Sequence, residues 1–180
     1  MNKEVSLIFA APGWETCPFD TEIWTCNTIY RKIYRHAKGK VDKLFIMHRQ
    51  VIQPNGAEVF NWEHITGMMF RHSFEVVALH DIPMETTPYP YDDIVDYFGT
   101  EYIASSHSYM LVYALYHGYT KVHIYGTHFY PGISTSADDL YERCGLEYWI
   151  GRANGMGVEV EVHGGDLLIT STGEPYAIHG

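Results

Sequence analysis

The sequence has few basic residues and no long apolar run, and each absence excludes a class of function. Its 180 residues include 12 lysines and arginines against 22 aspartates and glutamates, a formal net charge of −10. Because nucleic-acid backbones are bound by clustered basic side chains, no extended nucleic-acid surface is expected. No apolar stretch approaches the roughly 20 residues that a membrane helix needs, and the N-terminal one is too brief for a secretory signal. We expect a cytoplasmic protein without a membrane partner.

Local signatures of disulfides, metals and familiar catalytic sites are also missing. The cysteines form neither a CxxC pair nor an even framework, so reduced thiols are expected at Cys17, Cys26 and Cys144. There is no P-loop, GxGxxG, GxSxG or HExxH motif. Three histidines that lie close in sequence lack the spacing of a preformed zinc site: His117, His123 and His128. No structural metal is therefore expected, and whether a ligand brings a divalent ion is left open.

What the chain does have is a regular alternation of apolar runs and helical patterns. Buried strands are predicted over 5–10, 22–26, 43–48, 74–79, 121–125 and 158–162. Helices are predicted over 27–37, 59–71, 105–118 and 140–154. The proline-bearing segment 80–91 reads as a loop or sheet edge. This order predicts one Rossmann-like α/β domain over 1–180, a parallel sheet with helices on both faces.

Aromatic residues are abundant, at 15% of the chain with 15 tyrosines. Such an excess suits a stacking pocket or the interface of a homo-oligomer. Ordinary use of tyrosine in the core and on the surface accounts for much of it as well, so a monomer and a homo-oligomer both stay open.

In a parallel sheet, ligands bind outside the carboxyl ends of the strands, so the site is expected there. The turn after the first strand offers backbone N–H groups to a phosphate at Ala11, Gly13 and Trp14, although a simple tight turn is the alternative. Ser105 and Ser106 open the clearest helix, whose N-terminus favours an anion. Simple capping of that helix explains the two serines equally well.

Two residues are candidates for proton transfer. His128 follows a predicted strand end beside Tyr130, and an ordinary imidazole pKa of about 6.5 suits it to exchange protons. A solvated loop histidine is the alternative. Glu142 lies in the first turn of the last long helix, where acids commonly do no more than stabilise the helix dipole.

Two stretches carry a family resemblance. One follows the first strand with EIWTCNTIYRK and KLFIMH; the other is IASSHSYMLVYALYHGYTKVHIYGTHFYPG over 103–132, continued by EYWIGRANGMGVEVEV from Glu147. Together they resemble the CMP-sialic-acid-dependent sialyltransferases of glycosyltransferase family 42. They also resemble Rossmann-like proteins with the archaeal-type 6-hydroxymethylpterin diphosphokinase fold and uncharacterised phage proteins.

The resemblance implies roles for individual residues. It would place Asn27 and Ser105 against a nucleotide, with Ser106 beside them and Gly13 with its neighbours near phosphate. Tyr130 would match a tyrosine that contacts the nucleotide phosphate. The family's catalytic base is a histidine on a segment before the final helix. This chain has no histidine over 138–143, so His128 or Glu142 would have to replace that base.

The expected ligand is therefore a small molecule, a nucleotide or nucleotide-sugar donor, used in glycosyl or phosphoryl transfer. Two alternatives stay open. One is a non-catalytic protein that captures a nucleotide signal, as a phage-encoded sequestering protein would. The other is an interaction domain whose vestigial site is filled by Trp14 or Tyr130.

Overall fold

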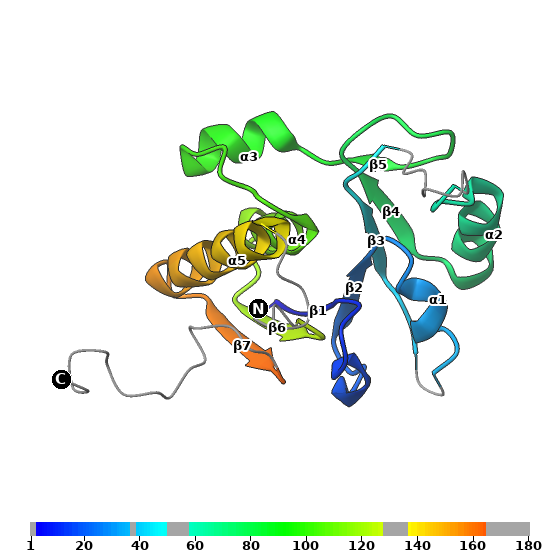
Figure 1. Ribbon diagram of the computed structural model, residues 1–180, viewed down its shortest axis with the longest axis horizontal. Helices are drawn as coiled ribbons and strands as arrows, with labels where there is room; N and C mark the ends of the chain where they lie inside the picture. The colour runs from blue at the N-terminus through cyan, green and yellow to red at the C-terminus, as the bar shows by residue number, and fades with distance from the viewer. Residues whose placement is uncertain (1–2, 37–38, 50–57, 128–136, 165–180) are drawn as a thin grey trace.

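Seven parallel strands form a single sheet (Figure 1). The computed structural model describes residues 3–36, 39–49, 58–127 and 137–164. Within them the strand order is β5-β4-β3-β2-β1-β6-β7, and every neighbouring pair is parallel. The strands are β1 (Glu4–Ile8), β2 (Glu22–Cys26), β3 (Lys43–Ile46), β4 (Glu75–Ala78), β5 (Thr87–Pro88), β6 (Lys121–Tyr125) and β7 (Glu159–His163).

Helices cover both faces of this sheet, as expected. They are α1 (Tyr30–Ile33), α2 (Trp62–His72), α3 (Tyr91–Phe98), α4 (Ser106–Tyr116) and α5 (Ala137–Gly155), with a short 3-10 helix η1 (Trp14–Thr16) after β1. Figure 1 shows α1 and α2 on one side of the sheet and α3, α4 and α5 on the other. The predicted Rossmann-like α/β fold is confirmed.

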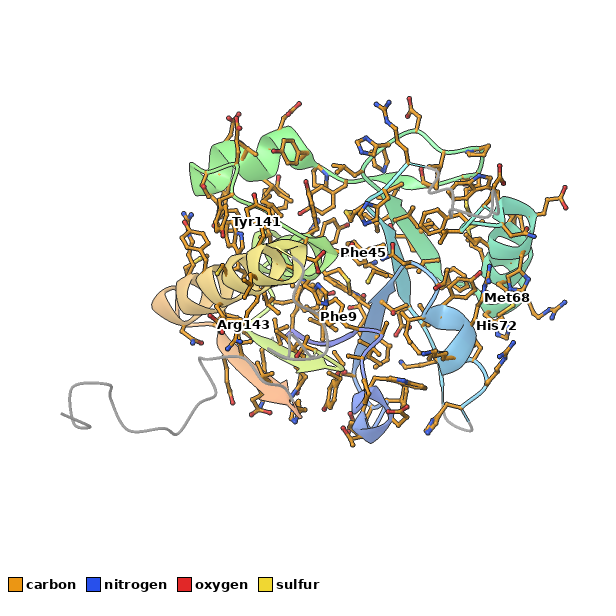
Figure 2. All side chains as sticks on the ribbon, in the orientation of Figure 1. Phe9, Phe45, Met68, His72, Tyr141 and Arg143 are labelled. Atoms are coloured by element: carbon orange, nitrogen blue, oxygen red, sulfur yellow. The ribbon has the colours of Figure 1, made fainter. Side chains whose placement is uncertain are left out.

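Each face of the sheet has its own core, because alternate residues of a strand point to opposite sides. Leu7, Phe9 and Phe45 belong to the cluster beneath α4 and α5, whereas Ile8 and Leu44 belong to the cluster beneath α1 and α2. Figure 2 shows Phe9 and Phe45 toward α4 and α5, and Met68 on α2 at the opposite side. Burial on both faces explains why the strands appear in the sequence as continuous apolar runs.

The chain changes direction across the sheet at β1. From β1 it runs outward through β2, β3, β4 and β5, and it then crosses back to place β6 on the other side of β1. The strand that follows β1 in the chain, β2, therefore lies on one side of the β1–β6 pair, and the strand that follows β6, β7, lies on the other. Such a topological switch point opens a crevice at the carboxyl ends of the two strands.

The structure differs from the prediction at two helices. The helix predicted over 27–37 is wrong in extent: α1 covers Tyr30–Ile33, because Asn27 has a left-handed φ of 52° that a right-handed helix does not contain. Helix α3 was not predicted at all. It starts after Pro90 and ends at Gly99, whose φ is 65°, and at 8 residues it is too short for its periodicity to stand out from the prolines before it.

Gly126 allows the ends of β1 and β6 to approach closely. Its φ is +70°, and a Cβ there would lie 2.5 Å from the carbonyl oxygen of Phe9 and 2.8 Å from that of Ala11. We predict that Gly126→Ala lowers the free energy of unfolding by about 2 kcal/mol or more, from backbone strain and overlap. Urea denaturation followed by circular dichroism measures this. Gly151→Ala on exposed α5, where a Cβ meets nothing within 4 Å, is the control and is expected to be neutral or stabilising.

Candidate functional site

A groove runs along the carboxyl ends of the central strands. Its middle cavity has a volume of about 260 Å³ and lies where β1, β2, β6 and α4 meet; it is lined by Phe9, Ala10, Ala11, Cys26, Asn27, His48, Ser106, His107, Gly126 and Glu142. A cavity of about 600 Å³ shares His48 and Ser106 with it. A third, of about 550 Å³, shares Ala10, Cys26, Asn27 and His48. We call these three adjoining cavities the carboxyl-end groove.

Asn27 is held in the groove at some energetic cost. Its backbone has the left-handed φ of 52°, and its N–H donates to the Phe45 carbonyl at 3.1 Å. Its side-chain Oδ1 is buried and has no hydrogen-bond partner among the described residues. Left-handed backbone and an unsatisfied buried oxygen both cost free energy, and such features concentrate where a ligand completes the site.

The N-terminus of α4 faces the same groove. Ser105 is the N-cap residue, and its Oγ accepts a hydrogen bond from the Ser108 N–H at 3.4 Å. Ser105 and Ser106 are both buried, and both line the groove. The N-terminus of this 11-residue helix is the positive end of its dipole, so an anion is stabilised here.

His107 is a groove residue that the sequence did not single out. Its ring packs against Phe9 with the centroids 4.1 Å apart, and its Nδ1 lies 3.7 Å from Oε2 of Glu142. Burial lowers the pKa of His107 to about 4, so the imidazole is neutral at neutral pH. Its place in the SSHSYM stretch was visible, but its proximity to Glu142 depends on how α4 packs against α5.

Cys26 lines the groove but is not a nucleophile. Burial, with a smaller contribution from the charge of Glu142, raises the pKa of its thiol to about 12. At neutral pH the thiol is protonated, and only a thiolate is strongly nucleophilic. Besides Cys26, the middle cavity is lined by three side chains that can accept or donate a proton: Glu142, His107 and His48.

The turn after β1 is arranged differently from a phosphate-binding loop. The N–H of Ala11, which lines the groove, donates to the Gly126 carbonyl at 3.0 Å. The N–H of Gly13 donates to the Glu15 carboxylate at 3.1 Å. Both N–H groups already have acceptors, and phosphate binding by Ala11 and Gly13 stays a prediction.

Trp14 does not fill the groove, as a vestigial site would require. It is 6% exposed and packs in the core beneath α1 and α2, with its ring 5.6 Å from that of His36. Neither Trp14 nor Gly13 lines the carboxyl-end groove. The predicted residues His128 and Tyr130 lie outside the described residues, so their roles stay predictions.

From the predicted set, the groove therefore brings together Ala11, Asn27, Ser105, Ser106 and Glu142, and it adds His107. Comparison with known proteins shows what this fold resembles. No family model and no curated protein sequence matches the chain.

Solved structures of one enzyme do match. The sialyltransferase CstII from Campylobacter jejuni with cytidine 5′-monophosphate is 16% identical, over 94% of this chain and 82% of that one, with a TM-score of 0.56. The same enzyme with CMP-3FNeuAc is also 16% identical over the same shares, with a TM-score of 0.55. CST-II with a trisaccharide acceptor and CMP is 15% identical over 94% and 83%, with a TM-score of 0.56. At this identity the likeness shows a shared fold.

The resemblance to sialyltransferases is thus confirmed at the level of the fold. The resemblance to pterin diphosphokinases and to phage proteins stays a prediction. Among the described residues, no helix combines the length and apolarity needed to cross a bilayer.

The buried imidazole of His107 predicts a pH dependence of stability. Its pKa falls from 6.5 to about 4 on folding, so the unfolded chain binds the extra proton between these values and the free energy of unfolding falls as the pH drops through them. We expect the parent to lose up to roughly 3 kcal/mol more than His107→Gln between pH 7 and pH 4. Urea denaturation at several pH values tests this, with His72→Gln on exposed α2 as the control; equal losses in parent and His107→Gln contradict it.

Proposed function

We propose that the carboxyl-end groove binds a CMP-type nucleotide-sugar and transfers the sugar to an acceptor hydroxyl. The observation that carries the proposal is the buried Oδ1 of Asn27 at the switch point of the sheet, which has no hydrogen-bond partner in the described part of the chain. A cytosine amino group or a ribose hydroxyl is the kind of donor that satisfies such an oxygen. The similar fold of CstII, solved with CMP and CMP-3FNeuAc, supports a nucleotide of this class.

The phosphate of the donor belongs at the N-terminus of α4. Ser105 and Ser106 line the groove there, and the helix dipole stabilises negative charge. Charge on the phosphate increases as the sugar leaves, so this helix end stabilises the transition state more than the bound donor. The same contacts that bind the donor therefore assist the departure of CMP.

Glu142 is the proposed general base. The acceptor oxygen attacks the anomeric carbon, the bond from that carbon to the phosphate oxygen breaks, and CMP leaves with the electron pair. The acceptor's proton passes to the Glu142 carboxylate, which lines the middle cavity. Neutral His107 lies beside Glu142, with its Nδ1 3.7 Å from Oε2, and does not neutralise the charge of that carboxylate.

A non-catalytic binder and a phosphoryl transferase, the alternatives to a glycosyltransferase, differ in whether they need Glu142 and His107. A non-catalytic nucleotide binder needs Asn27 and the α4 N-terminus but no base. A carboxylate and a neutral imidazole adjoining in the groove therefore favour an enzyme. Phosphoryl transfer would use the same anion site with a different leaving group, and product analysis distinguishes the two reactions.

Removing the Asn27 carboxamide should weaken nucleotide binding. We choose Asn27→Gly, because glycine keeps the left-handed backbone that alanine would strain. The affinity for CMP, measured by isothermal titration calorimetry, is expected to fall by about 1–3 kcal/mol. Asn154→Ala, an exposed position on α5, should bind like the parent. Equal CMP affinities for parent and Asn27→Gly rule out this placement of the nucleotide.

Removing the proposed base should abolish turnover while sparing binding. Glu142→Gln is expected to reduce kcat by about 10²- to 10⁴-fold, the usual contribution of general base catalysis, with CMP affinity nearly unchanged. Release of CMP from CMP-sialic acid, followed by chromatography, gives the rate. Glu147→Gln on the same helix, where Glu147 pairs with Arg143 at 3.1 Å, is the matched control. CMP binding without turnover in the parent would identify a binder instead.

A further inference from the structure

A second cluster of ligating side chains lies on the sheet itself, away from the carboxyl-end groove. His123 of β6 and Glu161 of β7 are direct neighbours in the strand register, and His163 is two residues further along β7. All three project from the face opposite α4 and α5, since the alternate residues Val122 and Ile124 belong to the core beneath those helices. None of the three lines the groove.

The three ligating atoms form a triangle of the size that a tetrahedral metal ion requires. His123 Nδ1 is 3.0 Å from Glu161 Oε2 and 3.0 Å from His163 Nε2, and the third side measures 3.6 Å. Ligands placed 2.0–2.1 Å from a tetrahedral zinc ion are separated by about 3.3 Å. The spacing of the three atoms therefore matches that of three ligands of one zinc ion.

Each of the three ligating residues also has a supporting contact with a neighbouring side chain. His123 Nε2 lies 2.6 Å from a carboxylate oxygen of Glu4 on β1, a contact that favours the tautomer with its proton on Nε2 and leaves Nδ1 as a lone pair. Lys121 binds Oε1 of Glu161 at 2.7 Å, so Oε2 is turned toward the histidines. The ring of His163 stacks on Tyr125, with centroids 4.3 Å apart and planes 7° from parallel.

We propose that His123, His163 and Glu161 form a binding site for a divalent transition-metal ion, Zn²⁺ in particular. Two imidazoles and one carboxylate are a donor set that zinc uses, and a histidine whose second nitrogen donates to a carboxylate is the usual support of such a ligand. The ion would cross-link the edge strand β7 to β6, and the contact with Glu4 of β1 would orient His123.

This proposal is independent of the proposed function, because it involves none of the groove residues. The probes are Zn²⁺ and Co²⁺ added to the full chain after treatment with a chelator. Co²⁺ bound by nitrogen and oxygen in a tetrahedral site gives visible absorption, and calorimetry gives its stoichiometry and affinity. We expect one equivalent to bind, and Zn²⁺ to raise the melting temperature by mass action. Mg²⁺, which prefers oxygen ligands, should leave the melting temperature unchanged.

Variants test the individual residues. His163→Gln and Glu161→Gln are each expected to lose the Co²⁺ spectrum and the Zn²⁺-dependent rise in melting temperature, while folding as judged by circular dichroism in chelator. Glu161 is 39% exposed, so its amide variant provides the result if His163→Gln does not fold. Glu4→Gln, which changes only the support of His123, should bind about 10- to 100-fold more weakly.

His117→Gln, an exposed histidine at the end of α4, is the matched control and should bind metal like the parent. Binding that is equal in parent, His163→Gln and Glu161→Gln would overturn the proposal, because the ion would then sit elsewhere on the chain. Absence of any Zn²⁺ or Co²⁺ binding by the parent would overturn it too, and would leave the cluster as a hydrogen-bonded array of histidines and carboxylates.

Discussion

The backbone contact between the ends of β1 and β6 determines where this molecule can bind a ligand. Phe9 N–H donates to the Tyr125 carbonyl and Ala11 N–H to that of Gly126, at 2.9 and 3.0 Å. No Cβ fits between these chains at Gly126. The two strands therefore stay adjacent up to their last residues. The next strands in the chain lie on opposite sides of this pair, β2 beside β1 and β7 beside β6, and the groove lies at this switch point with Asn27 and the N-terminus of α4 in its walls.

Much of the fold was readable from the sequence, because strands buried on both faces must be apolar throughout. β1, β2, β3, β4 and β6 all correspond to predicted runs. The shortness of α1 was not readable, because the helical spacing over 27–37 does not record the left-handed φ of 52° at Asn27. Strand order was not readable either. It depends on which strands pair with β6, and that long-range contact leaves no local pattern in the sequence.

The sequence likewise identified some residues of the candidate site and not others. Ser105 and Ser106 could be found as the start of a helix, and Asn27 by family resemblance to a nucleotide-binding position. His107 could not be found, because its low pKa and its proximity to Glu142 arise from burial between Phe9 and α5. The Gly13 amide shows the opposite case. A Pro-Gly turn predicts a free N–H, but the Glu15 carboxylate, two residues on, accepts from it.

The cluster of His123, Glu161 and His163 shows why short-spacing zinc motifs did not identify its histidines. Zinc motifs with short spacings describe ligands on one helix or one hairpin, where sequence neighbours are also neighbours in space. In a parallel sheet, adjacent strands are separated by a whole crossover, and here His123 and His163 are 40 residues apart yet in contact. The informative pattern is instead alternation within each strand: Lys121, His123 and Tyr125 share one face, as do Glu159, Glu161 and His163. Pairing these two triplets in parallel register is enough to place histidine, carboxylate and histidine together.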